Sequence, residues 1–346
     1  MKVGLIGRRG CGKTTIFNML TGLEAQVGGY TGSDKGEIHL GVIKVPDQRI
    51  DRLAEIFQPK KTTYAEIRFT DFPANQGNDK LKVGSEFLGQ MREVEAIALV
   101  LRDFEPKTDP LGELNDLLAE MILADLVVVE NRLAKLKKEK GKEQESLVLE
   151  RCRKTLESEE SLRVLSLTPD EENLISGFGF LSRKPLLALF DTSDERAGKP
   201  LLPAQEQELQ RRAIQGLALA GKVEMEIAQL NETDRKAFLK EIGIEESARA
   251  RFIRASYLLL DLISFLTTGK DEVRAWTIKR GTTARKAAGK IHSDIERGFI
   301  RAEIYKYDDL AKYGSYKALQ EKNLVTLEGK EYEMKDGDAV HFRFSV

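Results

Sequence analysis

The segment Gly7-Arg8-Arg9-Gly10-Cys11-Gly12-Lys13-Thr14 matches the Gly-x-x-x-x-Gly-Lys-Ser/Thr pattern of a phosphate-binding loop. Apolar residues 2–6 precede it as a short predicted strand, and residues 15–20 follow as the start of a predicted helix. The glycines allow backbone angles that let successive N–H groups turn toward a phosphate. Lys13 is expected to reach the outer phosphates, and the Thr14 hydroxyl to bind Mg²⁺. This context favours nucleotide-phosphate binding over a simple glycine-rich turn.

One loop supplies most of the residues expected to contact the nucleotide. They are Gly7, Gly10, Cys11, Gly12, Lys13, Thr14 and Thr15. A carboxylate is also needed to organise Mg²⁺, usually at the end of a neighbouring strand. Asp71 follows the predicted strand 64–70 and is the candidate. Lys13 and Asp71 are therefore the predicted catalytic groups, and Thr14 and Asp71 the predicted Mg²⁺ ligands.

Length and composition indicate an ordinary folded protein of two or three domains. Of its 346 residues, 41% are apolar and 32% charged, and the formal net charge is −1. This balance gives no global case for nucleic-acid binding, although a local patch can still bind RNA. The two cysteines and three histidines are scattered, which argues against a zinc site. No segment has the pattern of a signal peptide or a membrane span, so we expect a cytoplasmic protein without a membrane partner.

Strands that alternate with helical segments predict an α/β domain with a mostly parallel sheet. Residues 96–101 and 185–190 are continuous apolar runs, as expected of buried parallel strands. Residues 38–45 are another strand candidate, and Pro46-Asp47 opens a predicted helix over 48–56.

A charged segment without proline interrupts this pattern from about residue 126 to 167. Apolar residues recur there every three or four positions, which predicts two antiparallel helices in a protruding, coiled hairpin. The two stripes are Val129, Leu133 and Leu136, then Leu149, Cys152 and Leu156. Helices with a solvated face packed on the body of the protein are the alternative.

The last part of the chain, from about residue 261, changes to short strands and turns and predicts a small β-rich domain. Residues 273–306 hold nine Lys or Arg against three Asp or Glu, with Trp276, Phe299 and Tyr305 among them. This basic excess could face RNA or a ribosome. Many small domains carry such a charge without binding nucleic acid, so both interpretations stay open.

A second acidic segment, Asp191-Thr192-Ser193-Asp194, follows the apolar run 185–190 and is the candidate for base recognition. Asp194 could accept two N–H bonds from guanine, whereas an Asp191 carboxylate cannot donate as an Asn amide does. A pair of carboxylates that caps a helix is the alternative.

Taken together, these residues resemble the YchF/Obg-like ATPase family, a branch of the Obg-related translation-factor NTPases. The strongest segments are 272–278, 287–292, 296–303, 328–330 and 336–338. Their succession looks like the TGS domain, a ubiquitin-like β-grasp fold. Further similar segments are 45–47, 124–126 and 222–226.

The resemblance implies a phosphate-loop domain split by a coiled-coil insertion and followed by a TGS domain. The expected boundaries are 1–125 and 184–260 for the nucleotide-binding domain, 126–183 for the insertion and 261–346 for the TGS domain. Family members bind and slowly hydrolyse purine nucleoside triphosphates, often ATP, and associate with ribosomes. Mg²⁺ with ATP or GTP is the implied cofactor and substrate, and the ribosome or RNA the implied partner.

The chain departs from the family pattern around the nucleotide. Gly10 replaces an Asn associated with monovalent cations, and the family's Asp-x-x-Gly becomes Asp71 to Ala74. Asp191 and Asp194 replace the base motif Asn-x-x-Glu.

Three more departures fall in the surrounding loops. Gly221 lies where the family has a Ser-Ala-Lys base loop. Thr31 and Lys35 lie in a glycine-rich first switch that has no clear equivalent of the Mg²⁺-binding Thr. The family's Gly-rich stretch is shortened to residues 75–78. Within it, Asn75 or Gln76 is the candidate to position the attacking water, and the alternative is that both are ordinary polar loop residues.

The leading hypothesis is a Mg²⁺-dependent NTPase with slow turnover that acts as a nucleotide-controlled, ribosome-associated factor. The alternative is a diverged scaffold that binds nucleotide, RNA or the ribosome without significant hydrolysis. The choice between ATP and GTP is left open by the residues.

Overall fold

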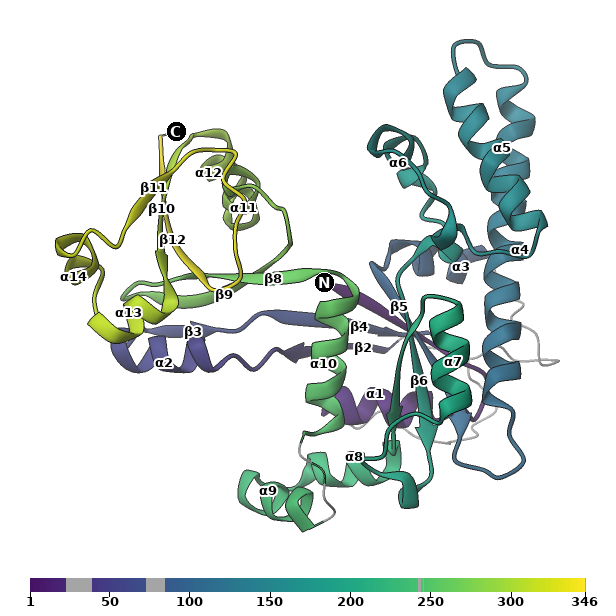
Figure 1. Cartoon of the computed structure of the whole chain (residues 1–346), viewed down its shortest axis with the longest axis horizontal. Helices are drawn as coiled ribbons and strands as arrows, with labels where there is room; N and C mark the ends of the chain where they lie inside the picture. The colour runs from purple at the N-terminus through teal and green to yellow at the C-terminus, as the bar shows by residue number, and fades with distance from the viewer. Residues whose placement is uncertain (23–38, 73–84, 242–243, 245, 346) are drawn as a thin grey trace. The chain divides into compact units, whose positions relative to one another are not determined.

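The computed structural model describes residues 1–22, 39–72, 85–241, 244 and 246–345 (Figure 1). The chain divides into two compact units. The larger unit comprises residues 2–41 and 68–255, and the smaller unit comprises Met1 with residues 42–67 and 256–346.

A six-stranded sheet in the order β2-β4-β1-β5-β6-β7 lies mostly in the larger unit, while the last residues of β2 (42–44) and the first of β4 (66–67) are counted in the smaller unit. The bounds are β1 (Lys2–Ile6), β2 (His39–Lys44), β4 (Glu66–Asp71), β5 (Ala96–Asp103), β6 (Leu186–Thr192) and β7 (Gln215–Leu219). The strands from β4 to β7 in this order pair in parallel. The apolar runs of β5 and β6 are buried, as parallel strands covered on both faces require. The predicted α/β fold with a mostly parallel sheet is confirmed.

Six helices of this part of the chain connect the strands or follow the last one. They are α1 (Lys13–Thr21), α3 (Ser85–Glu93), α7 (Pro203–Arg211), α8 (Gly221–Gln229), α9 (Glu232–Glu241) and α10 (Ala248–Leu259). In parallel sheets of this kind, ligands bind at the carboxyl ends of the strands, where the order of connections reverses. The segments that follow β1, β4, β5 and β6 therefore decide the candidate site.

A helical insertion separates β5 from β6 (Figure 1). Its elements are α4 (Pro110–Leu136), α5 (Glu143–Glu157), η1 (Leu162–Val164), α6 (Pro169–Ile175), η2 (Ser176–Phe178) and η3 (Leu181–Arg183). Both predicted apolar stripes are buried in one cluster of α4 and α5. α4 begins at Pro110, where the Asp109 side chain caps it by accepting from Gly112 N–H at 2.9 Å.

Helix α4 is continuous across residue 126, at which the sequence prediction begins the insertion. Its first half packs into the core of the sheet through Leu114 and Met121, and its second half packs on α5 through Val129 and Leu136. Between these halves the fully buried carboxylate of Asp125 accepts from two N–H groups of η3, at the end of the insertion. The distances are 3.0 Å to Leu181 N and 2.7 Å to Ser182 N.

The smaller unit has its own six-stranded sheet, in the order β11-β10-β12-β8-β9-β3. The bounds are β3 (Lys61–Thr63), β8 (Leu262–Thr267), β9 (Glu272–Lys279), β10 (Phe299–Lys306), β11 (Thr326–Glu328) and β12 (Asp338–Phe344). β8 and β12 pair in parallel between antiparallel neighbours, and the core also holds three alanines of α11 (Ala284–Ile291). This is the β-grasp arrangement expected of the C-terminal part. Three short helices complete it: α12 (Ser293–Arg297), α13 (Tyr307–Tyr313) and α14 (Tyr316–Glu321).

Residues 42–67 belong to this unit, although the predicted boundaries assign them to the nucleotide-binding domain. β3 adds a sixth strand by pairing in parallel with β9. Helix α2 (Gln48–Phe57) adds Ile50 and Leu53 to the cluster that contains Leu266 and Tyr305. The domain boundaries set out above stay a prediction, because compactness and sequence divide the chain at different places.

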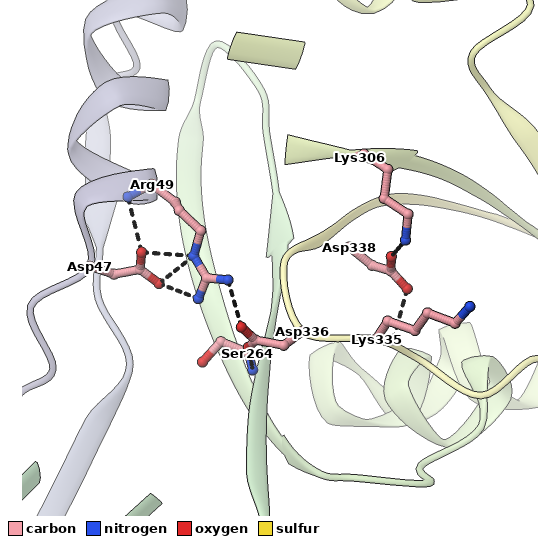
Figure 2. Close-up of polar contacts among 7 residues, drawn as sticks. All are labelled: Asp47, Arg49, Ser264, Lys306, Lys335, Asp336 and Asp338. Carbon is pink, nitrogen blue, oxygen red and sulfur yellow. Dashed lines mark hydrogen bonds and ion pairs between the residues drawn. The ribbon is translucent and has the colours of Figure 1, made fainter. Parts of the chain in front are cut away.

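An arginine of α2 is bonded to the C-terminal segment of the unit (Figure 2). Arg49 is held by Asp47, the residue that also caps α2, and its Nη1 donates to Asp336 Oδ2 at 2.8 Å. The other oxygen of Asp336 accepts from Ser264 N–H at 2.8 Å. One carboxylate therefore ties α2 to β8.

Asp338 organises the start of β12 in the same view (Figure 2). It is fully buried, and its two oxygens accept from Lys306 Nζ and from the N–H of Lys335, the second at 2.8 Å. The Asp336-Gly337-Asp338 segment, singled out in the sequence, is thus a structural anchor of the smaller unit.

Candidate nucleotide site

The phosphate loop connects β1 to α1. Gly10 and Gly12 have φ angles of 72° and 89°, which side chains other than glycine rarely adopt. Gly12 is the N-cap of α1, and its carbonyl accepts from Ile16 N–H at 2.9 Å. The loop therefore leads its N–H groups directly into a helix N-terminus, which favours an anion.

Cys11 and Gly7 close the inner side of this loop. A Cβ atom at Gly7 would lie 2.5 Å from Cys11 Sγ and 2.6 Å from the carbonyl oxygen of Val100, so no larger residue fits there. The Cys11 side chain is fully buried, and this burial raises the pKa of its thiol to about 12. Cys11 therefore contributes packing and its backbone N–H to the loop and is inert as a nucleophile.

Lys13 and Asp71 form a buried ion pair between α1 and the end of β4. The side chains are 8% and 3% exposed, and Lys13 Nζ donates to Asp71 Oδ1. The second carboxylate oxygen lies 3.5 Å from His39 Nδ1 on β2. The structure thus brings the two predicted catalytic groups together and adds a histidine that the sequence interpretation did not select.

Thr14 and Thr15 occupy the first turn of α1 and are half-buried. Phe72, directly after Asp71, is 4% exposed and donates its N–H to the Leu5 carbonyl at 3.2 Å, which extends the β1–β4 pairing to the start of the next loop. Asp71 is therefore held at a fixed place beside the phosphate loop.

Arg102 and Glu113 are further residues at the phosphate loop that the sequence interpretation missed. Arg102 Nη2 donates to the Arg9 carbonyl at 2.8 Å, and its guanidinium lies next to Gly10. Glu113, 9% exposed, accepts from Arg102 N–H at 3.1 Å. The sequence did contain a signal for Arg102, because the polar pair Arg102-Asp103 ends the apolar run of β5, just as Asp71 and Asp191 follow the apolar residues of β4 and β6.

Asp191 lies at the carboxyl end of β6 and contacts two candidate loops at once. Its Oδ1 accepts from Gly221 N–H at 2.9 Å, and a Cβ atom at Gly12 would overlap its Oδ2. The residue is 5% exposed. Burial, with a smaller effect of the Asp194 and Asp103 carboxylates, raises the pKa of Asp191 to about 7.

Asp194 has a different environment, although it is only three residues away. It begins the short helix η4 (Asp194–Arg196), and its side chain is 55% exposed. Its Oδ2 lies 4.0 Å from Lys222 Nζ at the start of α8. The structure thus places Asp191 against the phosphate loop and in contact with Gly221, and it places Asp194 at the surface. Neither aspartate caps η4, where Ser193 is the N-cap, but Asp191 accepts from the N–H of Gly221, the first residue of α8, as a capping carboxylate does.

Several sequence predictions lie outside the described residues. These are Thr31 and Lys35 of the first switch, Ala74 of the altered Asp-x-x-Gly pattern, and the candidate water-positioning residues Asn75 and Gln76. Within the described ranges, no helix is long and apolar enough to cross a bilayer.

Two family models match most of the chain. One, described as "50S ribosome-binding GTPase", matches residues 2–132. The other is the C-terminal model of YchF GTPases, described as a protein of unknown function, and matches residues 262–345.

Full-length relatives agree with these matches. The chain is 36% identical over 368 residues to the "Ribosome-binding ATPase YchF" of Bacillus subtilis, with all of both chains covered. It is 35% identical to the Escherichia coli O157:H7 protein of the same name, with 100% and 99% covered. The solved structure of the Schizosaccharomyces pombe YchF GTPase matches with a TM-score of 0.84 at 27% identity, covering 99% of this chain and 97% of that one. The chain therefore belongs to the YchF family, as its residues suggested.

Proposed function

We propose that the protein is a Mg²⁺-dependent purine-nucleotide-binding factor that hydrolyses ATP or GTP slowly and associates with the ribosome. The buried Lys13–Asp71 pair beside the phosphate loop is the observation that carries this proposal. A lysine and a carboxylate at this place are the charges that phosphoryl transfer needs near the outer phosphates and the metal.

The pair also supports a simple exchange of charges on nucleotide binding. A buried carboxylate is costly without a cation beside it, and Lys13 supplies that cation here. When Lys13 turns to a phosphate, a second cation must take its place near Asp71. Each buried charge therefore keeps a partner throughout.

Mg²⁺ fits the role of the second cation beside Asp71. The described residues contain no group of three or more His, Cys, Asp or Glu that could hold a metal by itself. Mg²⁺ is typically bound through one or two protein oxygens, phosphate oxygens and water, and the Thr14 hydroxyl and Asp71 carboxylate meet that demand. The ion would supply charge neutralisation at the outer phosphates, while Lys13 and the loop N–H groups orient them.

A titration with fluorescent ATP and GTP analogues, with and without Mg²⁺, tests nucleotide binding. Mg²⁺-dependent binding with a preference for one base supports the proposal and identifies the base. No binding of either analogue at millimolar concentration rejects it.

Hydrolysis distinguishes an NTPase from a diverged scaffold that binds without turnover. Steady-state phosphate release by the wild type should be slow, and Lys13→Ala should abolish it. Equal release by both proteins would assign the signal to a contaminant and favour the scaffold.

The ribosome is proposed as the partner because the named relatives are ribosome-binding ATPases and the chain carries exposed basic residues on α11. These are Arg285, Lys286 and Lys290. Cosedimentation with ribosomes should weaken with salt and after charge reversal of these residues. Lys317→Glu, an exposed change on α14, is the matched control. Cosedimentation that ignores both salt and the α11 changes would remove this surface from the proposal.

A further inference from the structure

Asp191 occupies the position at which the family places an asparagine, and its carboxylate is buried between Gly221 and the phosphate loop. Its Oδ1 already accepts from Gly221 N–H, and its Oδ2 lies against the backbone of Gly12 in the phosphate loop. The side chain is almost completely removed from solvent. A carboxylate held in this way has one oxygen bonded to a backbone N–H and the other facing the phosphate loop.

The hydrogen-bonding groups of a purine decide whether Oδ2 of Asp191 must donate or accept a hydrogen bond. Adenine and guanine both present N7 as an acceptor. An asparagine can meet this acceptor with its amide N–H, but an ionised aspartate has only acceptors. The ionised form would also add a negative charge behind a loop that binds a triphosphate. A neutral aspartic acid has one acceptor and one donor and is nearly the same shape as asparagine.

We propose that Asp191 binds the purine in its neutral form, with Oδ1 accepting from Gly221 N–H and the Oδ2 hydroxyl donating to N7 of the base. This inference rests on the proposed function, because it specifies how the same site controls its nucleotide. At a pH where Asp191 of the free protein is ionised, each nucleotide that binds brings one proton from solvent onto this carboxylate. The protein thereby couples nucleotide occupancy to pH.

Burial and the neighbouring carboxylates favour the neutral form of Asp191, against the bond from Gly221 N–H, which favours the ionised form. The charged or titratable groups of the elements around it are Cys11 and Lys13 on the phosphate loop and α1, Arg102 and Asp103 on β5, Asp194 in η4 and Lys222 on α8.

The cations among these groups are engaged elsewhere. Lys13 is paired with Asp71, Arg102 donates to the Arg9 carbonyl, and Lys222 lies near Asp194. Burial is the largest effect on Asp191 and acts with the two neighbouring aspartates to raise its pKa to about 7, while the bond from Gly221 N–H acts in the opposite direction.

The test measures the dissociation constant of the Mg²⁺-saturated nucleotide analogue from pH 6.0 to 8.5 for the wild type and Asp191→Asn. The wild type should bind with nearly constant affinity below about pH 7 and weaken by about tenfold per pH unit above it. Asp191→Asn should bind tightly at both ends of the range. His39 near Asp71 is retained in both proteins, so a difference in slope belongs to Asp191.

Calorimetry in two buffers of different ionisation enthalpy gives a second measurement on the unaltered protein. Binding at pH 8.0 should take up close to one proton per nucleotide in the wild type and in the control Asp170→Asn, an exposed change on α6. Calorimetry on the wild type tests the inference even if Asp191→Asn does not fold.

The outcomes separate this inference from the function on which it rests. Nucleotide binding that is independent of pH in the wild type, or equally dependent on pH in Asp191→Asn, overturns the role of Asp191 and leaves nucleotide binding intact. Absence of binding at every pH in both proteins overturns the proposed function itself.

Discussion

The phosphate end and the base end of the candidate site treat buried charge in opposite ways. At the phosphate end, Lys13 and Asp71 neutralise each other. At the base end, Asp191 is buried near two further carboxylates and is bonded to a backbone N–H. An ion pair keeps both partners charged, whereas a buried carboxylate without one tends to keep its proton. Two carboxylates at the ends of strands in one sheet can therefore differ in charge, because one has a cation beside it and the other does not.

The largest expected effect comes from removing the cation at the phosphate end. Lys13→Ala should lower NTP hydrolysis by at least about 100-fold, because the outer phosphates lose their main side-chain cation. It should also destabilise the fold by roughly 3–5 kcal/mol, because Asp71 is left buried and unpaired. Urea unfolding and phosphate release measure the two effects.

The double variant Lys13→Ala/Asp71→Asn sharpens this result. It should recover most of the lost stability without recovering hydrolysis. A double variant as unstable as Lys13→Ala would show that the buried Asp71 carboxylate does not need a cation beside it.

Gly12→Ala should affect both ends of the site at once. The new Cβ would overlap Asp191 Oδ2, and the φ angle of 89° is strained for alanine, at a cost on the order of 1–3 kcal/mol. Nucleotide affinity should fall by about tenfold or more. Gly22→Ala is the matched control, since Gly22 has a φ of 71° and nothing within 4 Å of the added Cβ. Equal losses of affinity in both variants would assign the effect to backbone strain alone.

Asp191→Asn should stabilise the protein at alkaline pH and leave it unchanged at acid pH. The pKa of Asp191 rises from 3.8 to about 7 on folding, so the folded state holds a proton that the unfolded chain loses between these values. The stability of the wild type therefore falls with rising pH over this window, by up to roughly 4 kcal/mol in total. The variant lacks this loss and should lead by that amount at pH 8. A lead of the same size at pH 4 would indicate better packing instead.

The smallest effect is expected at Asp194. Its side chain is more than half exposed, so Asp194→Asn should change stability by less than about 0.5 kcal/mol. The affinity for one purine should fall several-fold relative to the other, because this surface carboxylate is the candidate acceptor for a base N–H. Parallel titrations with ATP and GTP analogues measure the ratio, and an unchanged ratio removes Asp194 from base recognition.

The sequence could predict the parts of the site that depend on local pattern. The phosphate loop is one continuous segment between a strand and a helix, and Asp71 and Asp191 each end an apolar strand. The structure shows that Asp71 contacts Lys13 and that Asp191 contacts Gly12 and Gly221. The degree of burial, which sets the protonation of Asp191, depends on residues from several elements and was not visible in the sequence.

In the fold too, the features that depend on local sequence pattern could be predicted, and those that depend on contacts between distant segments could not. The strands and the two apolar stripes of the insertion follow from hydrophobic period. The predicted start of the insertion falls inside α4, because one helix changes its packing partner without a break in helical pattern. Nothing local in residues 61–63 indicates that they pair with β9, since this pairing joins segments far apart in the sequence.

The place of β3 in the smaller unit has a consequence for synthesis of the chain. Lys60 and its ion-pair partner Asp271 are separated by 211 residues, so β3 leaves the ribosome long before β9 exists. At about 5–20 residues per second, the wait is roughly 10–40 s. During that time Ile50 and Leu53 have no completed core to enter, and the strand edge is open to other chains. A nascent chain of this protein therefore needs residues 256–346 before its early segment 42–67 is protected.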